Sequence, residues 1–236
     1  MTQDPLWRAI HDSLHGDIVA GRYRPGDKLP TEAALAARFA VNRHTVRRAL
    51  GALAEAGTIH TRRGAGAFVA HRPTDYPLGK RVRFHQNLRA AGRAPAREIL
   101  TIETRNAAPT EAEALRLAPG APVHVCEGLS LADGMPLSLF QSLFPVDRFP
   151  TLPEALRRHR SITAALGDCG LADYTRASTR LTAKLATPSQ ARHLQIAPGA
   201  PILRTTAINV DENGVPVEYG RAWFAGERIT FTLDAE

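Results

Sequence analysis

The stretch FAVNRHTVRRALGAL, residues 39–53, combines a regular apolar spacing with three arginines. At 100° per residue Val46, Leu50 and Leu53 fall on one face of a helix, and most of the basic side chains point away from it. Asn42 is suited to cap this helix, which places cations in the first turns, where the helix dipole disfavours them. Because a solvated surface helix also explains a charge run, the neighbouring sequence has to decide.

The flanking sequence indicates a winged helix-turn-helix. Apolar residues recur every fourth position from Leu6 to Ile18 and predict a helix that ends before the turn RPGD, 24–27. Thr31 is placed to cap a short helix over 32–39, and a tight turn then leads into the basic helix. The alternating segments TIHTRR and AFVA flank a glycine-rich tip, which predicts a hairpin in the position of a wing.

Composition and charge indicate a soluble protein of two domains with a nucleic-acid-binding module in its N-terminal third. The 236 residues are 44% apolar and 22% charged, which is ordinary for a globular chain. Residues 1–72 hold 11 basic and 6 acidic residues, whereas the remaining chain holds 19 and 17, so the basic excess lies in the N-terminal third. No apolar run approaches the ~20 residues of a membrane span, and we expect a cytoplasmic protein.

The two cysteines, Cys126 and Cys169, lie far apart and lack metal-ligand spacing. We expect both to be reduced, and we expect no metal site and no cofactor.

Beyond the first third, the chain repeats itself. LRLAPGAPVHVCEGLSLADGMPLSLFQSLF at 115–144 matches LQIAPGAPILRTTAINVDENGVPVEYGRAWF at 194–224. Each copy predicts a strand, a helix, a Pro-Gly turn and a hairpin with an Asp-Gly or Asn-Gly tip. Capping boxes are expected at Thr110 with Glu113 and at Thr187 with Gln190. The pattern predicts an α+β domain of two similar halves with a ligand cleft between them.

The segment HRPTDYPL, 71–78, has two prolines and no periodicity, which indicates a linker. We therefore expect a DNA-binding domain over 1–72, a linker over 73–78 and an effector-binding domain over 79–236.

In this order of elements the chain resembles the GntR family of bacterial transcription regulators, in its HutC-type branch. The signature-like stretch is PGDKLPTEAALAARFAVNRHTVRRALGALAEAGTIHTRRGAGAFVA, 25–70. The C-terminal part resembles the UTRA-like effector domain of that branch, whose fold is similar to that of chorismate lyase. VNRHTVRRAL and DYPLGKRVRFHQNL also resemble regulators of phosphonate metabolism. The resemblance implies a repressor of phosphonate uptake or utilisation genes, released from its operator by a small anionic effector; a regulator of another catabolic operon is the alternative.

The resemblance implies that the basic helix enters the major groove of double-stranded DNA. Arg43 and Arg47 match base-reading positions, and an arginine fork suits guanine O6 and N7. His44 is expected to add a base or phosphate contact, and Thr45 and Arg48 to hold phosphates.

The predicted wing adds a second set of DNA contacts. Arg62 and Arg63 are expected to follow the minor groove or its phosphates, while Gly64 and Gly66 allow close backbone approach. A homodimer on an inverted-repeat operator would supply two such modules.

The effector is expected between the two halves, with Phe224 as an apolar wall and polar contacts from Arg83, His85, Ser161, Arg180 and Glu218. Ser161 opens a predicted helix, whose N-terminal N–H groups suit an anion. Glu218 takes the place of Ser138 in the other copy, which suggests recognition of a hydroxyl or amine. The alternative is that Arg180 and Glu218 simply pair across a solvated sheet.

Two other classes of protein are disfavoured. A chorismate-lyase-like enzyme would need catalytic residues. Ser138 and Ser161 lie in no GxSxG motif, and the sequence has no HExxH motif and no carboxylate pair at a useful spacing, so we expect no catalytic residue. A non-specific nucleic-acid binder needs only charge, and it would have no use for a duplicated pocket.

Overall fold

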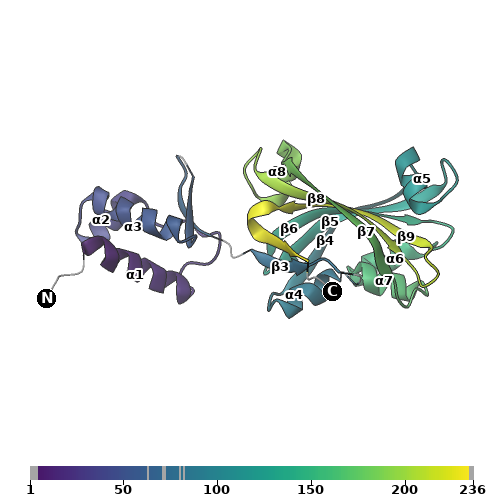
Figure 1. Cartoon of the computed structure of the whole chain (residues 1–236), viewed down its shortest axis with the longest axis horizontal. Coiled ribbons are helices and arrows are strands. Elements are labelled where there is room, and N and C mark those ends of the chain that lie inside the picture. Colours follow the sequence, from purple (N-terminus) through teal and green to yellow (C-terminus); the bar gives the residue numbers. More distant parts are fainter. Residues whose placement is uncertain (1–4, 63, 71–72, 80, 82, 234–236) are drawn as a thin grey trace. The chain divides into compact units, whose positions relative to one another are not determined.

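The computed structural model describes residues 5–62, 64–70, 73–79, 81 and 83–233. The chain divides into two compact units, Met1–Arg72 and Pro73–Glu236. The first unit contains α1 (Leu6–Val19), α2 (Glu32–Phe39), α3 (Arg43–Glu55), β1 (Ile59–Arg62) and β2 (Gly66–Val69) (Figure 1).

The first unit is a winged helix-turn-helix, as the sequence predicts. Val46, Leu50 and Leu53 of α3 are buried against Ile10 and Leu14 of α1 in one apolar cluster. β1 and β2 pair antiparallel and form the wing hairpin. One face of α3 is buried and its basic face is exposed, as the apolar spacing predicts.

The second unit is built on a six-stranded antiparallel sheet with the order β4-β5-β6-β9-β8-β7. Its strands are β4 (Pro95–Asn106), β5 (Pro122–Ala132), β6 (Met135–Pro145), β7 (Thr175–Leu185), β8 (Pro201–Val210) and β9 (Pro216–Ala225). The remaining elements are β3 (Thr74–Pro77), α4 (Phe84–Ala90), α5 (Pro109–Leu115), α6 (Leu152–His159), α7 (Ile162–Asp168), α8 (Pro188–Leu194), the 3₁₀ turn η1 (Gly226–Arg228) and β10 (Ile229–Thr232).

The sheet confirms the duplication. β6 pairs with β9 at its centre, and Gln141 lies opposite Arg221, the residue 80 positions later that is its repeat equivalent. The pseudo-two-fold axis of the domain therefore passes between these two residues. The equivalent helices α5 and α8 cover one face of the sheet, while α4, α6 and α7 lie on the other (Figure 1).

The structure corrects the expectation that residues 73–78 form only a linker. They contain β3, which pairs in parallel with β10 at the end of the chain. Tyr76 is buried and packs against the rings of Phe84, Phe224 and Phe231, so an aromatic anchor holds this strand in the domain. The alternation of buried and exposed residues is too short to stand out in the sequence.

One of the two predicted capping boxes is also shifted. Thr187 and Gln190 cap α8 as predicted. The N-cap of α5 is instead Ala108, whose N–H donates to the Glu111 carboxylate at 2.9 Å, so Glu113 has no part in this cap. No helix in the described ranges is long and apolar enough to cross a membrane.

Candidate DNA-binding surface and effector pocket

The start of α3 presents an exposed basic end. Asn42 caps it, and its Oδ1 accepts from both the N–H and the hydroxyl of Thr45 at 2.9 Å. This cap fixes the first turn, from which the side chains of Arg43 and His44 are exposed. The Thr45 hydroxyl donates its single proton to Asn42, so a phosphate contact from this hydroxyl would replace its bond to the cap.

Arg47 and Arg48 both contact neighbouring helices. Arg47 donates from Nε and Nη2 to the two oxygens of Glu32 at 3.1 and 2.8 Å, and this bond lowers the pKa of the Glu32 carboxyl. Arg48 lies with its guanidinium carbon 4.8 Å from the ring centroid of Trp7. Glu32 and Trp7 could not be foreseen as partners from the sequence, because they lie on other helices, α2 and α1. If Arg47 contacts a base, its guanidinium either leaves Glu32 or binds the base and Glu32 together.

The wing backbone turns at glycines. Gly64 and Gly66 have φ values of +75° and +105°, which favour glycine. A Cβ on Gly66 would lie 3.1 Å from Cε of Lys28, a residue that sequence reasoning missed and that lies beside the wing. The predicted contacts of the Arg62 and Arg63 side chains lie outside the described residues.

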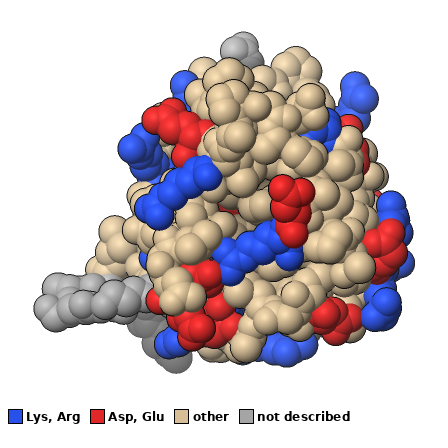
Figure 2. Space-filling model, turned by 90° about the vertical axis from the view of Figure 1, so that its right-hand side faces the viewer, with Lys and Arg blue, Asp and Glu red and all other residues tan. Residues whose placement is uncertain are grey.

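The face of the molecule shown in Figure 2 differs from the basic end of α3 in its distribution of charge. On the face of the molecule shown in Figure 2, basic and acidic side chains are interspersed and do not gather into a patch of one sign. Among the residues described there, that face lacks the extended basic surface that binds phosphates.

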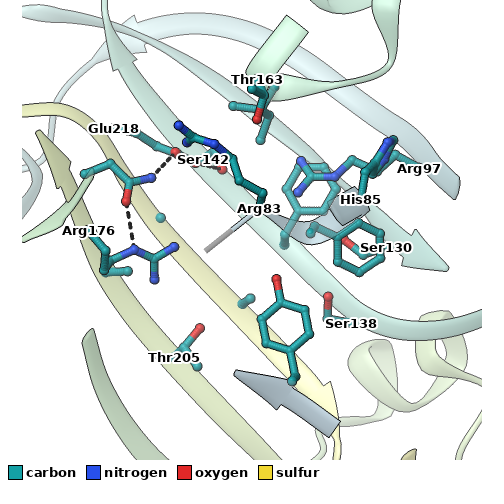
Figure 3. Close-up of a pocket in the computed structure, with 18 of the residues that line it drawn as sticks. Arg83, His85, Arg97, Ser130, Ser138, Ser142, Thr163, Arg176, Thr205 and Glu218 are labelled. Carbon is teal, nitrogen blue, oxygen red and sulfur yellow. Dashed lines mark hydrogen bonds between the residues drawn. The ribbon is translucent and has the colours of Figure 1, made fainter. Parts of the chain in front are cut away.

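A pocket of about 350 Å³ lies on the face of the sheet that carries α4 and α7. It is lined by five of the six predicted effector residues, namely Arg83, His85, Ser161, Glu218 and Phe224. Both halves of the duplication contribute, and Figure 3 shows Arg83 and Glu218 among its lining side chains. The Ser161 hydroxyl caps α7 through a 3.4 Å bond from the Ala164 N–H.

The structure does not bring Arg180 to this pocket. Its strand carries a β-bulge between Arg176 and Ser178, and Arg180 pairs with Thr206 in a groove beside α5 on the opposite face of the sheet. In a regular strand, residues four apart lie on the same face of the sheet. The extra residue of the bulge shifts the alternation by one, so Arg176 and Arg180 lie on opposite faces. The pocket therefore receives Arg176, and the alternative pairing of Arg180 with Glu218 is absent as well.

Glu218 belongs to a buried hydrogen-bond network. Its carboxylate accepts from the Ser142 hydroxyl and from the Asn209 amide, both at 2.6 Å. Arg176 donates from Nε to the Asn209 Oδ1 at 2.7 Å, so it orients this amide (Figure 3). The network fixes the carboxylate at one end of the pocket.

Arg83 is held at the rim of the pocket by three contacts. Its Nη2 donates to the Asp173 carboxylate at 2.6 Å and to the Tyr174 carbonyl at 3.1 Å, and its guanidinium carbon lies 3.8 Å from the Tyr174 ring centroid. Hydrogen bonding from Arg81, with a smaller effect of Arg83, lowers the pKa of Asp173. An effector anion would compete with this carboxylate for Arg83.

Arg97 is the main pocket residue that sequence reasoning missed. Its guanidinium carbon lies 4.5 Å from the ring centroid of Phe140, and its Nη1 is buried without a hydrogen-bond partner among the described residues. His85 Nε2 is in the same situation, and burial, followed by Arg97 and Arg89, lowers the pKa of this imidazole. Buried donors without a partner are costly, so they mark a place for a ligand.

A winged helix-turn-helix followed by a domain with a polar internal pocket defines a ligand-responsive DNA-binding protein. The model of the bacterial regulatory proteins of the gntR family matches residues 6–69, and that of the UTRA domain matches residues 90–230. The chain belongs to the GntR family, in its UTRA-containing, HutC-type branch, and it is a transcription regulator, not an enzyme.

Similar proteins span the whole chain. An uncharacterized HTH-type transcriptional regulator of Rhizobium meliloti is 38% identical over 97% of this chain and 94% of its own length. The probable transcriptional regulator PhnF of Escherichia coli is 36% identical over 90% and 88%. The crystal structure of PhnF from Mycobacterium smegmatis is 27% identical, with a TM-score of 0.68 over 96% of this chain and 99% of that one.

Proposed function

We propose that this regulator represses genes for phosphonate uptake or utilisation and leaves its operator when a small anionic effector binds. The charge of the pocket carries the proposal: among the described residues that line it, four arginines lie around a single acidic residue, Glu218, whereas the fifth, Arg221, pairs with Glu111 of α5 on the other face of the sheet. Such an excess of positive charge around a small cavity favours an anion. The phosphonate assignment is supported by the resemblance of VNRHTVRRAL and DYPLGKRVRFHQNL to phosphonate regulators and by the similarity to PhnF proteins.

The regulator acts in the cytoplasm as a homodimer on an inverted repeat. Two modules related by a two-fold axis place their recognition helices in successive major grooves about 34 Å apart. Arg43 and Arg47 read bases, with phosphate contacts from Arg48 and from the wing.

The effector switches the dimer by preferring the arrangement that does not bind DNA. A coupling free energy of about 1 to 3 kcal/mol is usual for such switches. Tyr76 and Arg83 line the pocket and lie on the first segments after the DNA-binding unit in the sequence. A ligand bound to them acts on the chain that leads to that unit.

The test starts from the operator, which is obtained by selection from random DNA with the full-length protein. Fluorescence anisotropy then measures release of that DNA by phosphonates, phosphate monoesters and sugar phosphates. We expect an inverted repeat, a dimer in solution, and release by phosphonates that Arg97→Gln abolishes. Arg180→Gln, on the opposite face of the sheet, is the matched control and should respond as the parent does.

A monomer that protects one asymmetric half-site would refute the dimeric mode. Release by a non-phosphonate metabolite alone would assign the regulator to another catabolic operon. Equal affinity for operator and random DNA would support a non-specific binder.

A further inference from the structure

The single carboxylate of the pocket lacks a charged partner. Glu218 is 7% exposed, its two hydrogen-bond donors, Ser142 and Asn209, are neutral, and it forms no ion pair within the described part of the chain. Arg176 approaches it only through Asn209. A carboxylate offers about four acceptor positions, so two remain for a further donor. A buried charge with neutral donors only is stabilised when a cation joins it.

The opposite pole of the pocket is a row of donors across three strands. Arg97 on β4 is in register with Ser130 on β5, which is in register with Ser138 on β6. Both serines are 2% exposed, and among the described residues their hydroxyls have no hydrogen-bond partner. Cross-strand neighbours lie about 5 Å apart, so these groups form a row along one side of the pocket (Figure 3), and the Arg97 guanidinium, with its buried Nη1, lies over Phe140 of β6.

The two poles lie close together on the same face of β6. The Arg97 guanidinium packs over Phe140, and the Glu218 carboxylate bonds to Ser142, two residues further along. Alternate residues of a strand are about 6.8 Å apart. Arg97 and Glu218 nevertheless form no ion pair with each other in the described structure, so a small ligand fits between opposite charges.

We propose that the effector is a compact zwitterion, with a primary ammonium bound to Glu218 and a tetrahedral oxyanion bound by Arg97, Ser130 and Ser138. This inference rests on the proposed function and names the ligand class of its pocket. Neutral His85 donates a further hydrogen bond to the oxyanion from Nε2. Phosphonates and phosphate monoesters share this head group, and 2-aminoethylphosphonate and O-phosphoethanolamine have a short chain between the two charges.

Isothermal titration calorimetry on the full-length protein compares three probes: 2-aminoethylphosphonate, O-phosphoethanolamine and ethylphosphonate, which lacks the amine. We expect 2-aminoethylphosphonate to bind at least about tenfold more tightly than ethylphosphonate, because a charge-assisted hydrogen bond to Glu218 is added. If O-phosphoethanolamine binds with a similar Kd, the pocket accepts phosphate monoesters as well as phosphonates. If it binds more weakly than 2-aminoethylphosphonate, the pocket selects the C–P bond.

Variants separate the two poles. Glu218→Gln should abolish the preference for the amine and leave the Kd for ethylphosphonate within about twofold of the parent. Arg97→Gln and, as a smaller change, Ser138→Ala should weaken both phosphonates equally. Arg180→Gln should change neither Kd. The melting temperature of each variant without ligand shows that the fold is retained.

The inference is overturned if ethylphosphonate binds as tightly as 2-aminoethylphosphonate, if Glu218→Gln retains the preference, or if none of the three probes binds. Release of operator DNA by an anion without an amine would reject the zwitterion and leave the proposed repressor standing. A protein that binds no specific operator would instead reject the proposed function.

Discussion

Gly128 on β5 occupies a position where the sheet leaves no room for a side chain. A Cβ there would lie 2.2 Å from the backbone oxygen of Glu98 and 2.9 Å from the ring of Phe140. Carbon atoms in contact are about 3.5 to 4.0 Å apart, so Gly128→Ala requires strand β4 to move by about 1 Å or more. The ring that must also move supports the guanidinium of Arg97.

The expected loss of stability follows from this geometry. Forcing an extra carbon into a packed core costs about 1 to 3 kcal/mol. The upper half of this range applies because the oxygen of Glu98 belongs to a paired strand and cannot rotate away. For a unit of this size each kcal/mol lowers Tm by about 2 to 4 °C, so differential scanning calorimetry should show a decrease of about 4 to 12 °C.

Gly167→Ala is the matched control in the same unit. Gly167 lies in α7, and an added Cβ would meet no atom within 4 Å. Alanine in place of a helical glycine stabilises by about 0.4 to 1 kcal/mol, so Tm should rise slightly. An unchanged Tm for Gly128→Ala would refute the reasoning, because it would show that β4 and the Phe140 ring yield without cost.

Further predictions concern DNA recognition and pH. Arg47→Ala should reduce the preference for one base pair in each half-site by about tenfold or more, and selection from random DNA would return the parental consensus unchanged if the residue reads no base. Arg48→Ala should weaken binding to operator and random DNA by the same factor, and a loss confined to the operator in anisotropy titrations would contradict its role at a phosphate. The free energy of unfolding should fall as pH drops below about 6.5, because burial lowers the pKa of His85 and His124 in the folded protein and the unfolded chain therefore takes up protons first. Urea unfolding at pH 7.5 and 5.5 measures this, and His85→Gln should reduce the difference between the two values.

Local patterns in the sequence determined the elements and their order. Three local features define the DNA-binding unit: apolar residues at every fourth position of α1, the helix caps Thr31 and Asn42, and the glycines of the wing. Each of them acts within a few residues, so the sequence alone reveals it. The repeat of 79 to 80 residues predicted the two halves of the effector domain, and Gln141 opposite Arg221 confirms it. These features required no knowledge of distant pairing.

The tertiary structure alone decided which side chains meet in the pocket. Alternation along β7 would place Arg176 and Arg180 on one face, but the bulge between Arg176 and Ser178 sends Arg180 to the other. Arg97 and Ser138 are 41 residues apart in the sequence, and they come to lie in one row across the pocket only because β4, β5 and β6 pair in one register. Periodicity fixes the face of a side chain within a regular strand, whereas bulges and strand register, which depend on distant residues, fix its neighbours.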